Sequence, residues 1–341
     1  MKKTLFAILC MISGYFAQGQ DLHFSQFFAS PLTLNPAETG NFIEDYRIGG
    51  NYKQQWPWAN NGKRYNYRTF SAYGDFSLLK GTLPKNDWLG VGLVLLHDNA
   101  GTGNLSVTKI FASAAYHRVL GNKKRYYLSM GINAGFVQKG IDYDRLYFNS
   151  QWNDLFFDNQ APSGENGGDR MNYFDMAAGL NFTALVRSNI RVNVGTSAMH
   201  LVKPKESFYN TSSNRLGVRP LAHAGTNIRF SPKWQLDASL IYMNQKKASE
   251  WLLDAVAGYS IGNNKNNKNV LYFGTIYRFN DALAPLLGYQ FNRIKVLMNY
   301  DINLSSLSQA SNSVGGFEVS VVHMGIFPSS TENRSLPCPR L

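Results

Sequence analysis

Short stretches of alternating apolar and polar residues recur along most of this chain. In the clearest case, one face of an extended segment carries Ile294, Val296, Met298, Tyr300, Ile302 and Leu304. The opposite face carries Lys295, Asn299, Asp301 and Asn303. Because successive side chains of a β-strand point to opposite faces, this pattern predicts a strand with one apolar and one polar side.

We predict about fourteen such strands, an even number, as in bacterial single-chain barrels. They cover residues 45–55, 66–78, 87–97, 104–119, 125–138, 172–186, 189–200, 221–231, 233–243, 250–261, 269–279, 282–291, 293–304 and 315–327. Strands of roughly 10 residues, with apolar side chains facing lipid and small or polar ones facing a lumen, are typical of transmembrane barrels. The predicted fold class is therefore all-β, a transmembrane antiparallel β-barrel of the outer membrane.

The lengths of the connections give a second indication. Outer-membrane barrels have short periplasmic turns and longer external loops, so the gaps should alternate in length. The gaps after strands one, five, seven and thirteen are long, whereas those after strands six, eight and twelve contain almost no residues; the short third, ninth and eleventh gaps weaken the pattern. We therefore expect odd gaps outside, even gaps inside, and both termini in the periplasm.

Aromatic residues near the strand ends favour a barrel over the alternative, a soluble exported β-sandwich. Tyr and Trp concentrate at membrane–water interfaces, where they form girdles, and a soluble sandwich has no reason to place them there. The candidate girdle residues are Trp56, Trp58, Trp88, Tyr126, Tyr127, Trp234 and Trp251. Charged residues make up 16% of the chain and aromatic residues 14%, which suits strands and turns better than helices.

The N-terminus has the features of a cleaved secretory signal. Lys2 and Lys3 precede an apolar stretch, and small residues stand near position 19. The expected divisions are 1–19 signal peptide, 20–44 periplasmic N-terminal segment, 45–327 barrel and 328–341 periplasmic C-terminal tail. No later apolar run reaches the roughly 18 residues that a membrane helix needs.

Removal of the signal would leave Cys338 as the only cysteine and would lower the formal charge from +12 to about +10. For a protein exported to the envelope, this charge faces a lumen, anionic lipid or an acidic protein partner, and we expect no nucleic acid partner.

Recognisable catalytic or metal-binding motifs do not occur in the sequence. The histidines are scattered, and no nucleophile elbow, phosphate loop or zinc-ligand spacing is present, so we expect no cofactor and no metal. A barrel hydrolase is the least favoured alternative; it would use a pair such as His223 and Ser239 on adjacent strands. The acidic loop with Asp154, Asp158, Glu165 and Asp169 lacks regular calcium-ligand spacing, so we expect a solvated loop rather than a calcium site, and we expect it to be the place where an external partner would bind.

The segment from Gln20 to Gly40 does not alternate like a barrel strand. It contains Gln20-Asp21, then Phe24-Ser25-Gln26-Phe27-Phe28, then Asn35-Pro36-Ala37 and Gly40. This order strongly resembles the opening of the PorP/SprF family of the Bacteroidetes, in which Q-D-x-x-F-S-Q-F-Y is followed by N-P-A-x-x-G. Phe28 replaces the usual tyrosine.

Further matches extend the resemblance over nearly the whole chain. They include Gly90-Val91-Gly92 leading to Asp98 and Gly101, and the closing Pro337-Cys338-Pro339-Arg340-Leu341. His97 stands where asparagine is common, and Leu341 where phenylalanine is common. The resemblance implies a non-enzymatic outer-membrane component of the type IX secretion system, linked to gliding motility. Its implied role is secretion or surface attachment of a large adhesin that bears a C-terminal signal domain.

The implied partners are type IX secretion proteins of the outer membrane and periplasm, the C-terminal domain of the adhesin, and the lipid bilayer. The candidate partner-binding residues are Phe24, Gln26, Phe27, Phe28, Asn35, Pro36, Gly40, Asp98 and Gly101. The aromatic residues among them offer large anchor groups for a partner. Equally, they would pack inside the barrel mouth, so the N-terminal segment either caps the lumen or docks on neighbouring proteins. The alternative function is a passive channel or small-solute transporter.

Overall fold

The computed structural model describes residues 23–56, 67–121, 123, 125–158, 160–165, 167–209, 214–261, 269–305, 308 and 313–327. The proposed signal peptide, the tail from residue 328 and Trp58 lie outside these residues. Within them, no helix is long and apolar enough to cross a membrane.

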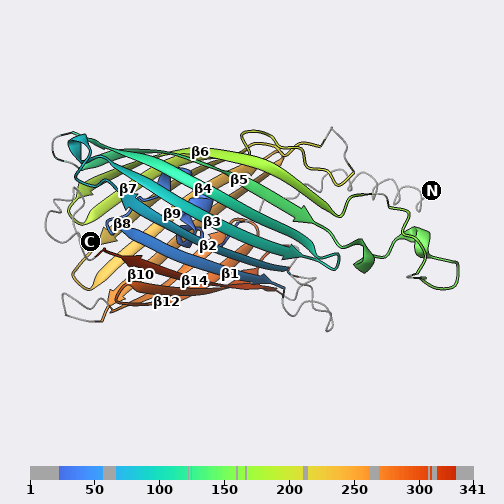
Figure 1. Ribbon diagram of the computed structural model, residues 1–341. Helices are drawn as coiled ribbons and strands as arrows, with labels where there is room; N and C mark the ends of the chain where they lie inside the picture. The colour runs from blue at the N-terminus through green and yellow to red at the C-terminus, as the bar shows by residue number, and fades with distance from the viewer. Residues whose placement is uncertain are drawn as a thin grey trace.

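Fourteen antiparallel strands close into one barrel, in which each strand pairs with its sequence neighbours and β1 pairs with β14 (Figure 1). The strands are β1(Tyr46–Gln55), β2(Tyr67–Leu78), β3(Trp88–Ala100), β4(Leu105–Leu120), β5(Tyr126–Gly140), β6(Arg170–Arg187), β7(Ile190–Met199), β8(Arg219–Arg229), β9(Trp234–Gln245), β10(Ala248–Ser260), β11(Asn269–Arg278), β12(Ala282–Phe291), β13(Ile294–Asn303) and β14(Val314–Gly325). All fourteen predicted strands are confirmed, with ends displaced by a few residues at most. Closure leaves no unpaired sheet edge, as a lipid environment requires.

The two ends of the barrel differ, as Figure 1 shows, and we name them by their connections. The long-loop end carries the odd-numbered connections, including residues 141–169 and 200–218. The short-turn end carries the even-numbered ones, including 188–189, 230–233 and 292–293. The longest connections therefore lie at one end, as predicted, but the β3–β4, β9–β10 and β11–β12 connections at this end are short, so the predicted alternation is present only in part.

The strand alternation separates an apolar outer surface from a largely polar lumen. On β13, Ile294 and Met298 are exposed outward, whereas Asn299 and Asp301 are buried inward. Leu297, on the same inward face, is also buried, although we expected lumen-facing residues to be small or polar. It belongs to a cluster of apolar residues on the inward faces of β10–β13, which we call the apolar lining and which packs against Phe28.

The aromatic prediction is correct for some residues and wrong for others. Tyr126, Trp234 and Trp251 are exposed on the outer surface near strand ends. Trp88 and Tyr127 instead point into the lumen, where both are buried. The ring of Trp88 stacks on His117 with 4.6 Å between ring centroids, and its Nε1 donates a hydrogen bond to the carbonyl oxygen of Gly40. Proximity to a strand end therefore does not decide the direction of a side chain; the register parity does.

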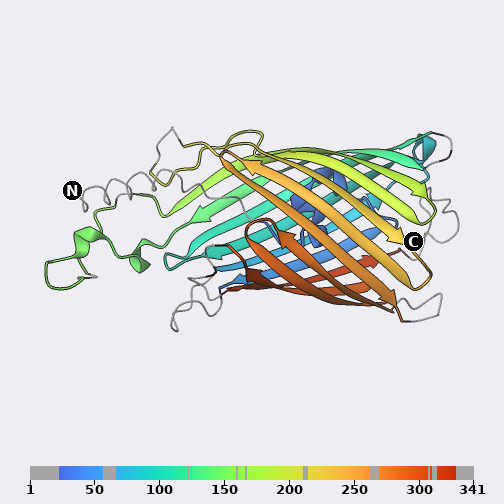
Figure 2. The same ribbon diagram turned by 180° about the vertical axis from the view of Figure 1, so that it is seen from behind.

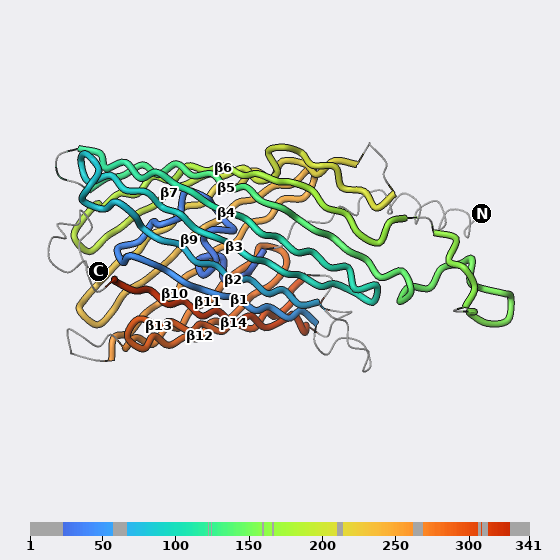
Figure 3. Tube along the Cα trace, in the orientation of Figure 1, coloured from blue at the N-terminus to red at the C-terminus, as the bar shows by residue number. Residues whose placement is uncertain are grey.

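Residues 23–44 lie inside the barrel, and we call them the plug (Figures 2 and 3). They form three short turns, η2(Phe27–Ala29), α2(Pro31–Leu34) and η3(Pro36–Glu38). The plug begins near the long-loop end, where His23 Nε2 lies 3.1 Å from Glu250 Oε1. It reaches the short-turn end, where Lys80 Nζ donates to three successive carbonyls, those of residues 42–44. The chain thus crosses the lumen before β1 begins. The described part of the expected periplasmic segment is a lumenal plug. The first and last described residues, His23 and Phe327, lie at opposite ends of the barrel, whereas the sequence predicts both termini on one side.

Candidate functional site in the barrel lumen

Asn35 and Pro36 attach the middle of the plug to the barrel wall. The Asn35 side chain accepts a hydrogen bond from the Ala37 backbone N–H at 2.9 Å, which caps η3. Its Nδ2 donates to the carbonyl of Leu180 at 3.0 Å and lies 3.0 Å from His223 Nε2. Since this side chain satisfies both its own turn and the wall, replacement of Asn35 would leave buried polar groups without partners.

Three inward glycines of the wall make room for this turn. A Cβ atom at Gly131 would lie 2.4 Å from the backbone of Pro36, and one at Gly179 would lie 1.9 Å from Asn35 Oδ1. A Cβ atom at Gly90 would lie 1.9 Å from the carbonyl oxygen of Thr39. These distances are shorter than any real contact, so the plug backbone lies directly on the strands. Glycine is needed here for close approach rather than for backbone flexibility.

A buried ion pair holds the part of the plug near the short-turn end. Asp75 of β2 accepts hydrogen bonds from Arg47 Nε and Nη2 at 3.0 and 2.8 Å, and also from the Gly40 N–H at 2.8 Å. Gly40 has a φ of +68°, a left-handed conformation that favours glycine. The Arg47 guanidinium lies over the Phe42 ring, 4.8 Å from its centroid. One carboxylate therefore joins β1, β2 and the plug.

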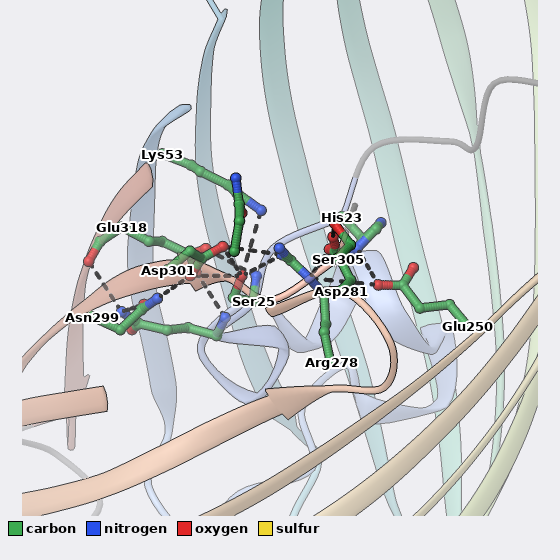
Figure 4. Close-up of polar contacts among 12 residues, drawn as sticks. His23, Ser25, Lys53, Glu250, Arg278, Asp281, Asn299, Asp301, Ser305 and Glu318 are labelled. Carbon is green, nitrogen blue, oxygen red and sulfur yellow. Dashed lines mark hydrogen bonds and ion pairs between the residues drawn. The ribbon is translucent and has the colours of Figure 1, made fainter. Parts of the chain in front are cut away.

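A second polar network holds the part of the plug near the long-loop end (Figure 4). Glu318 of β14 accepts hydrogen bonds from the backbone N–H groups of Ser25 at 2.9 Å and Gln26 at 2.8 Å. The Ser25 hydroxyl lies 3.1 Å from Arg278 Nη1, which forms an ion pair with Asp301 at the same distance. All five residues are buried. Charge-assisted hydrogen bonds of this kind are among the stronger protein contacts, so the plug is tied at both ends.

Between these networks, Phe27 and Phe28 close one side of the lumen. Phe27 packs with Leu221, Ile241, Met243 and Leu252, which are inward residues of β8–β10. Phe28 contacts the same cluster and also the apolar lining of β10–β13. We call this apolar contact the phenylalanine seal.

A lumenal cavity of about 350 Å³ lies against the seal. Its wall includes Arg191, Asp237, Asp254 and Lys295, all from strands, and plug residues that include Phe27 and Phe28. Among the described residues, no cluster of three metal-ligating side chains is present. Glu38 and Asn41 of the plug also line the cavity, which therefore combines the apolar seal with polar and charged groups of both the plug and the barrel wall.

The structure brings most of the candidate partner-binding residues together in the plug. Phe24, Gln26, Phe27, Asn35, Pro36 and Gly40 are buried within the barrel, and Phe28 is partly buried. Their contacts are with the barrel wall rather than with an open surface. Asp98 is buried separately, where it accepts a hydrogen bond from Thr69 Oγ1 at 2.6 Å. Gly101 lies in the hairpin that follows β3 and has a φ of +72°.

His223 and Ser239, the pair named for a hydrolase, both line the lumenal cavity but do not bond to each other. His223 contacts Asn35, while the Ser239 hydroxyl donates to Asp254. A Ser nucleophile needs its base within hydrogen-bond reach. Here the acceptor of the Ser239 proton is a carboxylate, and the histidine is engaged by the plug.

Two long loops pack on each other outside the barrel at the long-loop end. The Gly168 N–H donates to the Phe208 carbonyl at 2.7 Å, and Lys139 pairs with Glu206. The Tyr209 hydroxyl donates to the Glu165 carboxylate, and this bond raises the pKa of Tyr209 to about 12. These contacts join the two loops to each other.

The first of these loops exposes a cluster of apolar side chains that we call the loop patch. Its members are Tyr147, Trp152, Leu155, Phe156 and Phe157. Leu155 is 83% exposed, Tyr147 68% and Phe156 58%. Exposed apolar clusters of this kind mark interaction sites more often than ordinary surface.

A closed barrel with an apolar outer surface and an internal plug defines a class, the plugged outer-membrane β-barrels. The sequence match gives the family: residues 16–323 match the type IX secretion system membrane protein PorP/SprF family, and the chain belongs to it. It is thus an outer-membrane barrel related to type IX secretion. No curated protein sequence matches the chain.

Solved structures with a similar fold come from other bacteria. The toluene transporter TbuX of Ralstonia pickettii aligns with a TM-score of 0.53 and 11% identity, over 88% of this chain and 94% of that one. A FadL homologue of Pseudomonas aeruginosa aligns with a TM-score of 0.51 and 10% identity, over 85% and 92%. The toluene transporter TodX of Pseudomonas putida gives 0.51 and 9%, over 86% and 92%. At these identities the likeness concerns the fold alone.

Proposed function

We propose that this barrel supports secretion or surface attachment of a large adhesin that carries a C-terminal signal domain. The observation that carries the proposal is the loop patch, which lies on the longest described loop of the long-loop end. Aromatic and large aliphatic side chains of this kind dominate the energetics of protein interfaces. Membership of a type IX secretion family supports a protein partner, and the tied plug favours binding over free passage of solutes.

We expect Leu155→Ser combined with Phe156→Ser to lower the amount of adhesin at the cell surface about tenfold or more, because loss of two anchor residues costs at least about 2 kcal/mol. Phe230→Ser is the matched control, since the exposed fraction of Phe230 lies between those of Leu155 and Phe156 but Phe230 lies at the short-turn end. Barrel abundance should be unchanged in both variants. Unaltered surface adhesin in the double variant would exclude the loop patch as the docking surface.

The proposal places the long-loop end outside the cell and the described C-terminal end of the barrel at the periplasmic side, because external loops of such barrels are longer. A cysteine at Leu155 should then react with a membrane-impermeant maleimide in intact cells, in a Cys338→Ser background. A cysteine at Ser188, in the β6–β7 turn, should react only after the cells are lysed. The opposite labelling would reverse the orientation.

A second candidate function is passage of small solutes. The lumenal cavity of about 350 Å³ and the fold shared with toluene transporters favour it. The phenylalanine seal and the two polar networks oppose it, because they hold the plug in the lumen. Conductance measurements in planar bilayers separate the two functions.

A further inference from the structure

A groove of about 730 Å³ crosses the outer wall of the barrel from β3 to β8. Its centre is formed by small outward residues, Ala114 of β4, Ala178 of β6 and Ala198 of β7. Larger apolar side chains border it, including Met130 and Ile132 of β5, both about half exposed. Gly131 and Gly179 also line the groove, so it lies over the strip of wall that the plug contacts from inside.

The location of the groove restricts its occupant. It opens on the apolar outer surface, where a barrel faces the hydrocarbon of the bilayer. A water-borne protein does not enter this zone, whereas a lipid acyl chain is already there. The volume lies in the range of ligand-binding sites, and the lining is almost wholly apolar.

One end of the groove leads to a group of basic residues at the short-turn end. Tyr116 lines the groove, and Arg118 follows two residues later on the same outward face of β4, about 7 Å along the strand. Lys123 and Arg125 stand in the turn after β4. We call Arg118, Lys123, Arg125 and Arg187 the basic corner.

The basic corner is compact and exposed. The Leu185 N–H donates to the Arg125 carbonyl at 2.8 Å, so the end of β6 with Arg187 lies beside the β4–β5 turn. All four side chains are exposed. In the described part of the chain, no carboxylate forms an ion pair with them. The nearby Asp87 is buried and accepts hydrogen bonds from the Tyr116 hydroxyl and the Val119 N–H.

We propose that the groove and the basic corner together form a binding site for an anionic phospholipid. One acyl chain lies in the groove over Ala114 and Ala178, and the headgroup phosphate lies against Arg118 and Arg125. The charge complementarity identifies the headgroup as anionic, because basic residues at a membrane surface attract acidic lipids. With the orientation proposed above, the lipid belongs to the periplasmic leaflet, although the binding itself does not depend on that orientation.

The test uses the purified, delipidated full-length barrel in detergent, mixed with equal amounts of phosphatidylglycerol and phosphatidylcholine of the same chain length. Native mass spectrometry then reports which lipid stays bound. We expect the wild type to retain phosphatidylglycerol preferentially. Arg118→Gln with Arg125→Gln should lower this preference about tenfold or more, at about 1 kcal/mol for each basic residue. Ala114→Trp should fill the groove and release both lipids.

Two controls locate the site. Arg229→Gln with Lys233→Gln removes charge from the same end of the barrel at the β8–β9 turn, and Ala255→Trp enlarges an outward residue of β10; neither should change retention. Heat-modified migration on gels verifies that each variant is folded. Arg187→Gln is a second variant that removes charge from the basic corner. Equal retention of the two lipids by the wild type would overturn the proposal. So would the same loss in the controls, or full competition by glycerol phosphate, which has no acyl chain.

Discussion

Asp75→Ala should release the part of the plug near the short-turn end, around Gly40, while the barrel stays closed. The substitution leaves the Arg47 guanidinium and the Gly40 N–H buried without their acceptor. Breaking a buried ion pair by removing one partner costs about 3–5 kcal/mol. At about 1.4 kcal/mol for each factor of ten, the undocked population should rise on the order of a hundredfold or more. The fourteen strands keep their backbone pairing, so barrel assembly should survive.

Chymotrypsin measures this release, because the plug contains Phe24, Phe27, Phe28 and Phe42 but no lysine or arginine, and Phe42 lies beside Arg47 at the released end. Cleavage after Phe42 should accelerate in Asp75→Ala, with a smaller change in Asp75→Asn, which keeps an oxygen acceptor. Asp237→Ala is the matched control, since Asp237 is a lumenal carboxylate that bonds to Asn227 of the neighbouring strand. Protection of the plug in Asp75→Ala equal to that of the control would show that Asp75 does not hold it.

The strands could be predicted from the sequence because each one carries its own signal. A segment such as 293–304 alternates without reference to any other part of the chain, and the two faces of β13 follow from this parity alone. The same parity could have corrected the aromatic prediction. Trp88 precedes Leu89 and Val91, which face outward with the groove, so its ring must point inward.

The ion pair between Arg47 and Asp75 was not predicted, for a reason that also concerns parity. Both residues occupy lumenal positions, but their contact depends on the register that places Arg47 directly opposite Asp75. Residues 56–66 connect the two strands, and a loop of this length does not fix a register as a two-residue hairpin does.

The sequence left two positions open for the N-terminal segment, inside the barrel lumen or against neighbouring proteins. The sequence Asn35-Pro36 favours a turn, because proline restricts its own conformation and that of the preceding residue, but a turn does not reveal which surface it contacts. Gly90, Gly131 and Gly179 were the missing signal, since they occur at inward positions in the interior of strands. Glycine inside a strand often marks close approach of another backbone. Only the pairing of β3 to β6 shows that these glycines lie in one strip.

Phe27→Ala combined with Phe28→Ala should convert a closed barrel into a conducting one. The seal is made by the two rings against the apolar inward residues of β8–β13, and the lumenal cavity of about 350 Å³ already reaches it. Truncating a buried phenylalanine to alanine costs about 3–5 kcal/mol, and the vacated volume joins the cavity. In planar bilayers the wild type should show little conductance, whereas the double variant should show discrete open channels. Phe136→Ala, on the exposed outer face of β5, is the control and should stay closed. A conducting wild type would favour the solute channel. An insulating double variant with a heat-modifiable barrel would show that the two polar networks close the lumen without the seal.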